Sequence, residues 1–380
     1  MKFLASSGRL GCVAAIALIT TVPTFALIKF DEGHDEIFVT GSAGMTYDSN
    51  IFASAEGSGD TSFNASLLLE YKRKAGMIGV DATAGWDFSK FSKFDSENFA
   101  NPRLTAELTK ASGRTTGDLR AEVRKENRAD TAINVRTESW DYDAQLDLKY
   151  PVIERYSLAG NFGYTLRDFV NNDALVDIAT YSAGLDLDYA LNSQRQLLVG
   201  YRYRNTDTSV HTKDTDHAVT AGVTGKIIPK LNGTVRVGLQ RRDIDRVNAK
   251  SEAHNSATAS ASVTWTLTSR LGLTGTAARD FSTVATDASV DTTSVNLDAQ
   301  YAVNAKTSAF AGIGYGHLKF LDTSISGRQD DYADANFGFS YTYSDRLKFT
   351  AIYTFIENWS TVAASDYSRH SISLSASTHW

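Results

Sequence analysis

The sequence offers neither the disulfides nor the membrane-spanning helices that exported proteins often use. Its one cysteine, Cys12, lies near the start, so a chain processed after residue 26 can form no disulfide. After residue 26 no apolar run approaches the roughly 20 residues that a membrane-spanning helix needs. The chain also lacks a Gly-x-x-x-x-Gly-Lys-Ser/Thr loop and any basic run with interleaved aromatics, which excludes P-loop nucleotide binding and argues against nucleic acid. Proline is scarce too, with four in 380 residues, as expected where nearly all the backbone pairs in strands.

The first residues predict export. Lys2 and Arg9 form a positive region, residues 11–22 are apolar, and Thr24-Phe25-Ala26 resembles a cleavage site, so residues 1–26 are predicted to be a signal peptide. We divide the rest into a periplasmic N-terminal segment at 27–36 and a transmembrane barrel at 37–380. The expected location is the outer membrane of a Gram-negative bacterium.

The last residues show the local pattern most clearly. Ile372, Leu374, Ala376, Thr378 and Trp380 alternate with serines and His379, which is the period of a strand with one apolar face. A terminal aromatic residue on such a strand is typical of outer-membrane barrels, where the barrel-assembly machinery reads it. Trp380 is therefore the predicted sorting signal.

The same alternation repeats along the chain as hairpins joined by short turns. Eight such turns recur, at residues 73–76, 111–114, 151–154, 192–194, 229–232, 268–270, 304–306 and 344–346. Together with the two terminal half-units they predict an all-β fold: a single transmembrane antiparallel up-and-down β-barrel of about 18 strands. Even parity places both termini beside the short turns, on the periplasmic side. Outer-membrane lipid is then the first expected partner.

The two faces of these strands supply the candidate site residues. Aromatics on the apolar face next to short turns predict an interfacial girdle: Tyr71, Tyr150, Tyr189, Trp265, Tyr301 and Tyr343. Charges on the other face predict a pore lining: Arg120, Glu122, Arg124, Asp143, Asp147, Arg167, Asp186, Asp188, Arg202, Arg204, Arg236 and Arg242. The other sector is predicted to be small and neutral: Thr258, Ser260, Ser262, Thr274, Thr276, Asn296, Gly312, Gly314, Gly316, Ser340, Thr350, Ser373 and Ser375. The charges can either set a transverse field for a solute or pair across strands to hold the barrel in shape.

Signs of catalysis or metal binding are weak. The seven histidines are scattered, and no Ser-His-carboxylate arrangement is marked. Asp214, Asp216 and His217 could suggest a metal loop, but acidic loop residues are usually only solvated. We therefore expect no enzyme activity, no metal and no cofactor. The outer loops read as short, with no long loop to fold inward, which predicts a wide duct.

A motif near the first strand carries a family resemblance. Gly44-Met45-Thr46-Tyr47-Asp48-Ser49-Asn50-Ile51-Phe52 resembles the Tyr-Asp-(Ser/Asn)-Asn-Ile motif of a family of β-barrel porins encoded in bacterial exopolysaccharide clusters. The resemblance implies an outer-membrane exit for a secreted polysaccharide. It also implies a periplasmic polysaccharide-export protein as partner.

Three functions follow as alternatives. The first is a passive aqueous duct for export of a secreted polysaccharide, together with periplasmic export proteins. The second is a general diffusion porin for small hydrophilic solutes. The third is a surface-structural or enzymatic barrel. The motif and the expected short loops favour the first.

Overall fold

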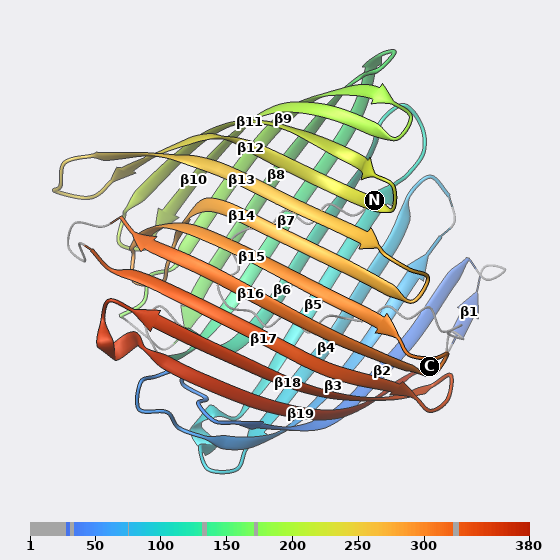
Figure 1. Ribbon diagram of the computed structural model, residues 1–380, viewed down its shortest axis with the longest axis vertical. Coiled ribbons are helices and arrows are strands. Elements are labelled where there is room, and N and C mark those ends of the chain that lie inside the picture. Colours follow the sequence, from blue (N-terminus) through green and yellow to red (C-terminus); the bar gives the residue numbers. More distant parts are fainter. Residues whose placement is uncertain (1–27, 31–33, 75, 131–134, 171–173, 322–326) are drawn as a thin grey trace.

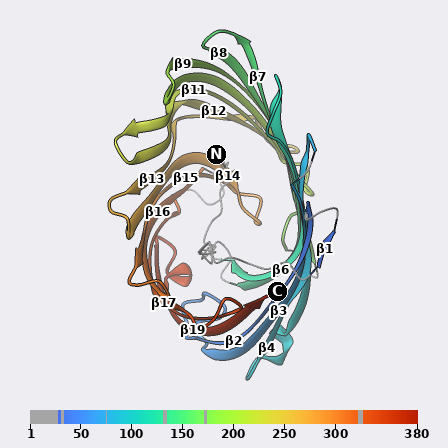
Figure 2. The same cartoon turned by 90° about the vertical axis from the view of Figure 1, so that its right-hand side faces the viewer.

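The computed structural model describes residues 28–30, 34–74, 76–130, 135–170, 174–321 and 327–380. The predicted signal peptide and Cys12 lie outside these residues. Figure 1 shows long tilted strands arranged as a barrel, and Figure 2 shows the ring that they form. Within the described ranges the only helical segments are two short 3-10 turns, η2 (Asp95–Glu97) and η4 (Ala363–Ser365), and no helix is long and apolar enough to cross a membrane.

The strands follow one another in chain order. The first half comprises β1 (Ile28–Phe30), β2 (Asp35–Asp48), β3 (Asp60–Arg73), β4 (Gly79–Phe91), β5 (Phe99–Lys110), β6 (Thr116–Asp130), β7 (Val135–Ile153), β8 (Tyr156–Val170), β9 (Ile178–Asn192) and β10 (Arg195–Thr208). The second half comprises β11 (Lys213–Ile228), β12 (Leu231–Asp245), β13 (Glu252–Thr266), β14 (Leu271–Thr283), β15 (Ser289–Ala302), β16 (Thr307–Phe320), β17 (Gln329–Thr342), β18 (Leu347–Ser360) and β19 (Tyr367–His379).

Strands β2 to β19 close into one antiparallel ring. Each pairs with its neighbour in sequence, and β19 pairs with β2 from Ser371↔Asp48 to His379↔Thr40. The short β1 pairs with the start of β2 and adds no strand to the ring. The predicted all-β barrel of about 18 strands is therefore confirmed. All eight predicted short turns join strands at one rim, where the chain also ends: Trp380 and Val39 exchange two backbone hydrogen bonds of 2.9 Å.

The alternation determines which side chains face outward. Val237 is 61% exposed and Leu239 74% exposed, while Gln240 and Arg242, further along the same strand at alternate positions, are buried. Apolar side chains would be unstable in this position in water, whereas lipid around the ring accommodates them. The girdle aromatics share this outward phase, and Tyr150, Trp265, Tyr301 and Tyr343 are exposed. Their role at the interface remains a prediction.

The first-strand motif has a structural role at the opposite rim. Asp48 receives a bidentate ion pair from Arg369 of β19, and its Oδ1 also accepts a hydrogen bond of 2.9 Å from the Asn50 backbone. The Asn50 side chain donates to the carbonyls of Ser54 and Ser368. These buried contacts fasten the outer loop after β2 to the strand that closes the barrel.

Candidate functional site: the barrel lumen

The predicted pore-lining charges lie on the inner face, and most of them form ion pairs. Arg167 donates to Asp141 (3.1 and 3.3 Å), and Lys149 contacts Asp188 at 2.6 Å. Arg120 and Arg124 both contact Glu122 on the same strand, at 3.0 and 3.4 Å. Asp147 lies opposite Asp118, and Asp143 opposite Glu122. The geometry therefore shows that these charges pair with one another. Whether they also act on passing ions remains a prediction.

One pair spans several strands because glycines leave room for it. Arg236 on β12 donates two hydrogen bonds of 2.8 Å to Asp186 on β9. Gly222 lies opposite Arg236 on β11, and Gly200 lies opposite Asp186 on β10. A Cβ at Gly200 would lie 1.8 Å from Asp186 Oδ1, so only glycine allows this ion pair to lie flat on the wall.

This pair allows a test of whether the inner charges control ion flow. Arg236→Gln removes the cation and leaves the Asp186 carboxylate without its bidentate partner. We therefore expect the reversal potential of the reconstituted channel, measured in a KCl gradient, to shift toward cation selectivity. The matched control, Arg236→Gln with Asp186→Asn, removes both charges and should return the potential to the original value. An unchanged potential in the single variant would place the pair outside the ion path.

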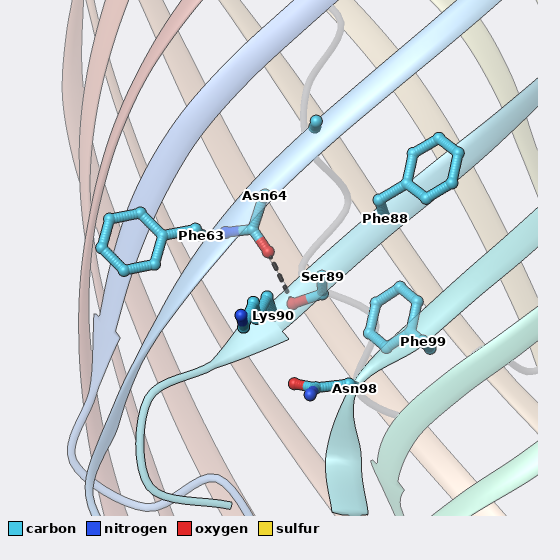
Figure 3. Close-up of a pocket in the computed structure, with 8 residues that line it drawn as sticks. Phe63, Asn64, Phe88, Ser89, Lys90, Asn98 and Phe99 are labelled. Atoms are coloured by element: carbon cyan, nitrogen blue, oxygen red, sulfur yellow. Dashed lines mark hydrogen bonds between the residues drawn. The ribbon is translucent and has the colours of Figure 1, made fainter. Parts of the chain in front are cut away.

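The opposite sector of the wall carries a row of neutral polar side chains. A row of hydrogen bonds runs across four strands: Ser373 of β19 to Thr46 of β2 (2.8 Å), Asn64 of β3 to Thr46 (3.2 Å), and Ser89 of β4 to Asn64 (2.8 Å). Figure 3 shows the last of these bonds, with Phe99 nearby. Two hollows of about 320 and 270 Å³ border the row. Hydroxyl and amide groups of this kind offer hydrogen bonds to a hydrated, uncharged solute.

The wall splits between β13 and β14 in its outer half, and the end of the β14–β15 hairpin turns inward while β15 stays paired with β16 to Val290↔Phe320. β13 and β14 pair only from Ala259↔Arg279 to Thr266↔Gly272, although β12–β13 pairing continues to Glu252 and β14–β15 pairing to Thr283. Figure 2 shows β14 and β15 lying inside the ring beside β13. We call residues 280–292 the inner hairpin.

Charged contacts fasten the inner hairpin to the lumen face of β10–β12. Asp280 accepts hydrogen bonds from Arg202 (2.7 and 2.8 Å) and from Arg204 (3.2 and 3.3 Å). Arg242 donates to the Ser282 carbonyl (2.9 Å) and to Asp214 and Asp216, in a cluster with almost no exposed surface. The guanidinium of Arg242 also lies 5.2 Å from the centre of the Phe281 ring.

The tip of the inner hairpin is also held by hydrogen bonds and apolar contacts. Asp287 accepts hydrogen bonds from Thr208 (2.8 Å) and Thr212 (2.6 Å), and the Ala285 carbonyl accepts one from the Val176 backbone. An apolar cluster covers its other side: Val284, Ala288, Val290, Leu318 and Phe320. The inner hairpin is thus a folded part of the lumen.

A second hairpin narrows the lumen from another side. β5 and β6 pair only from Arg103↔Arg124 to Lys110↔Gly117, whereas β6 and β7 stay paired to Asp130↔Val135. Beyond this split, Arg136 of β7 donates a hydrogen bond of 2.9 Å to Oε2 of Glu97, which lies between β4 and β5. The Arg136 guanidinium also lies 5.0 Å from the centre of the Phe91 ring of β4, which is buried and faces the lumen. The β6–β7 hairpin therefore crosses the inner face of β4 and β5.

These two hairpins correct the expected wide duct. The sequence contains no long loop that could fold inward, but the constriction is made by strands whose outer halves bend inward. One sign was present: five of the ten residues from Phe281 to Val290, across the β14–β15 turn, are apolar, whereas an exposed loop is usually mostly polar. Asp214 and Asp216, considered for a metal, instead bind arginines. Among the described residues no three His, Cys, Asp or Glu side chains gather closely enough to hold a metal ion.

Comparison with known proteins agrees with this architecture. A family model described as "Putative beta-barrel porin 2" matches residues 215–379, which confirms the resemblance to a β-barrel porin family. That match carries no association with exopolysaccharide export. No curated protein sequence matches the chain.

Solved outer-membrane channels share the fold at low identity. OpdK of Pseudomonas aeruginosa, solved with vanillate, is 12% identical with a TM-score of 0.51, over 90% of this chain and 99% of OpdK. OccK2 of the same organism, solved with glucuronate, is 11% identical with a TM-score of 0.51, over 93% and 100%. The chain spans 63% of the FrpB iron transporter of Neisseria meningitidis, covering 87% of itself, at 11% identity and a TM-score of 0.49.

Proposed function

We propose that this porin-like barrel is an outer-membrane diffusion channel that passes small hydrophilic solutes passively. The observation that carries the proposal is the pair of inward hairpins. An 18-strand barrel without them would enclose a broad aqueous channel, and a hydrated polymer would need that width. With them, the free cross-section is limited by the inner hairpin on one side and by the β6–β7 hairpin on another.

The chemistry of the lumen supports uncharged or cationic solutes within that class. The OpdK and OccK2 structures were solved with the carboxylic acids vanillate and glucuronate. A carboxylate solute needs available cations, but Arg167, Arg204, Arg236 and Arg242 are each already paired with an aspartate. The neutral row from Ser373 to Ser89 offers hydrogen bonds without charge.

Permeation by size tests the proposal. The protein is reconstituted into liposomes, and swelling is measured in isosmotic glucose, maltose and linear maltodextrins of increasing length. We expect swelling by glucose and maltose and a steep loss of rate for the longer chains. Liposomes without protein give the background. Rapid entry of long maltodextrins would contradict a small-solute channel.

A polysaccharide duct is the second candidate, favoured by the hydroxyl-lined row and by the first-strand motif. Such a duct would need a periplasmic export partner and a lumen that widens during transport. In the same swelling series, entry of long uncharged glycans would favour the duct, and entry of glucose and maltose alone favours the small-solute channel.

A further inference from the structure

The inner hairpin leaves an unpaired strand edge in the barrel wall. Residues 255–258 of β13 pair with β12 on one side, but on the other side β14 has already turned inward. A free edge presents backbone donors and acceptors that are stable only in water or against another strand. Residues 255–258 could therefore pair with another strand on this side, next to the point where β14 turns inward.

The register shows what could fill this edge. Pairing runs without a shift from Thr266↔Gly272 to Ala259↔Arg279. Continued by the same register, residues 280–283 would lie opposite residues 255–258. The phase also fits, because Phe281 and Thr283 would then face outward with Ala257 and Asn255, and Asp280 would stay on the lumen side.

With the inner hairpin in its inward position, one buried side chain lacks hydrogen-bond partners. Gln240 of β12 is only 3% exposed, and neither its amide nitrogen nor its amide oxygen has a hydrogen-bond partner within the chain. It lies opposite Ser256, at the edge that β14 has left. A buried polar group without a partner is destabilising, which offsets part of the gain from the Arg242 cluster.

We propose that the inner hairpin is a gate with two positions. In the closed position, seen here, it crosses the lumen and is held by Arg202, Arg204 and Arg242. In the open position it returns to the wall, β14 pairs with β13 to Asn255, and the lumen widens. The proposal rests on the proposed channel function, since it describes how the opening of that same lumen is controlled.

Two engineered disulfides test the open position. Ala257→Cys/Phe281→Cys and Asn255→Cys/Thr283→Cys join residues that are opposite only after the hairpin returns to the wall. The control pair Ala261→Cys/Ala277→Cys has the same face and the same type of pair in the observed register. Cys12 is the only native cysteine and lies in the predicted signal peptide, so it should not compete.

We expect the control pair to cross-link in membranes and at least one test pair to cross-link on mild oxidation. A cross-linked test pair should raise single-channel conductance, and reduction should reverse the rise. The Phe281→Cys variant alone, under the same oxidant, shows what loss of the ring does by itself. If the control cross-links while neither test pair does, or if cross-linking leaves conductance unchanged, the gate is wrong. The swelling series on the unmodified protein tests the channel function separately.

Discussion

Deletion of residues 371–380 is expected to abolish assembly of the barrel. These residues form most of β19, which pairs with β18 on one side and β2 on the other. Without them two strand edges face lipid, where each unsatisfied backbone group costs several kcal/mol. The measurement is the heat-modifiable band of the folded barrel in gels of the outer-membrane fraction, and we expect it to disappear.

Two further variants separate pairing from sorting in this experiment. Deletion of residues 28–30 removes β1, which pairs with the start of β2 outside the ring, and should leave assembly intact. Trp380→Ala keeps the backbone bonds to Val39 but removes the ring, which lies 4.1 Å from the Arg346 guanidinium. Loss of assembly in Trp380→Ala would assign the sorting role to the side chain. A heat-modifiable band after the ten-residue deletion would contradict closure by β19.

Truncation of Arg242 is expected to release the inner hairpin. Arg242 lies between Asp214 and Asp216, and all three side chains are about 1% exposed. Arg242→Met replaces the guanidinium by an apolar side chain of similar length and leaves the buried Asp214 carboxylate without its cation, at a cost of about 3–5 kcal/mol, whereas Asp216 keeps Arg204. We expect higher single-channel conductance and faster proteolysis within residues 284–288.

The matched variant distinguishes charge from packing. Arg242→Met with Asp214→Asn removes one charge of each sign and keeps an amide oxygen that can accept from Ser289 and Thr283, which now donate to Asp214 at 2.7 Å. Conductance and protease resistance should return toward those of the unaltered protein. Unchanged behaviour in the single variant would show that the inner hairpin is held by its apolar cluster instead.

Local patterning was enough to predict the wall. Alternation such as that from Ile372 to Trp380 requires no knowledge of the partner strand, because successive side chains in a strand always point to opposite faces. The short turns then predicted the strand count and placed the start of the first ring strand and the C-terminus at one rim. The outward aromatics and the inward charges followed from the same phase.

Only the tertiary structure decided how the lumen is filled. The sequence alone left the inner charges either free for a solute or paired, and Arg236 reaches Asp186 because Gly200 and Gly222 happen to lie between them. The inner hairpin depends on bonds between residues far apart in sequence, such as Arg202 and Asp280, 78 positions apart. β14 has the same strand alternation in the wall and in the lumen, so its local sequence cannot distinguish the two. The choice is made by the buried arginines and aspartates of distant strands, which closure of the barrel brings together.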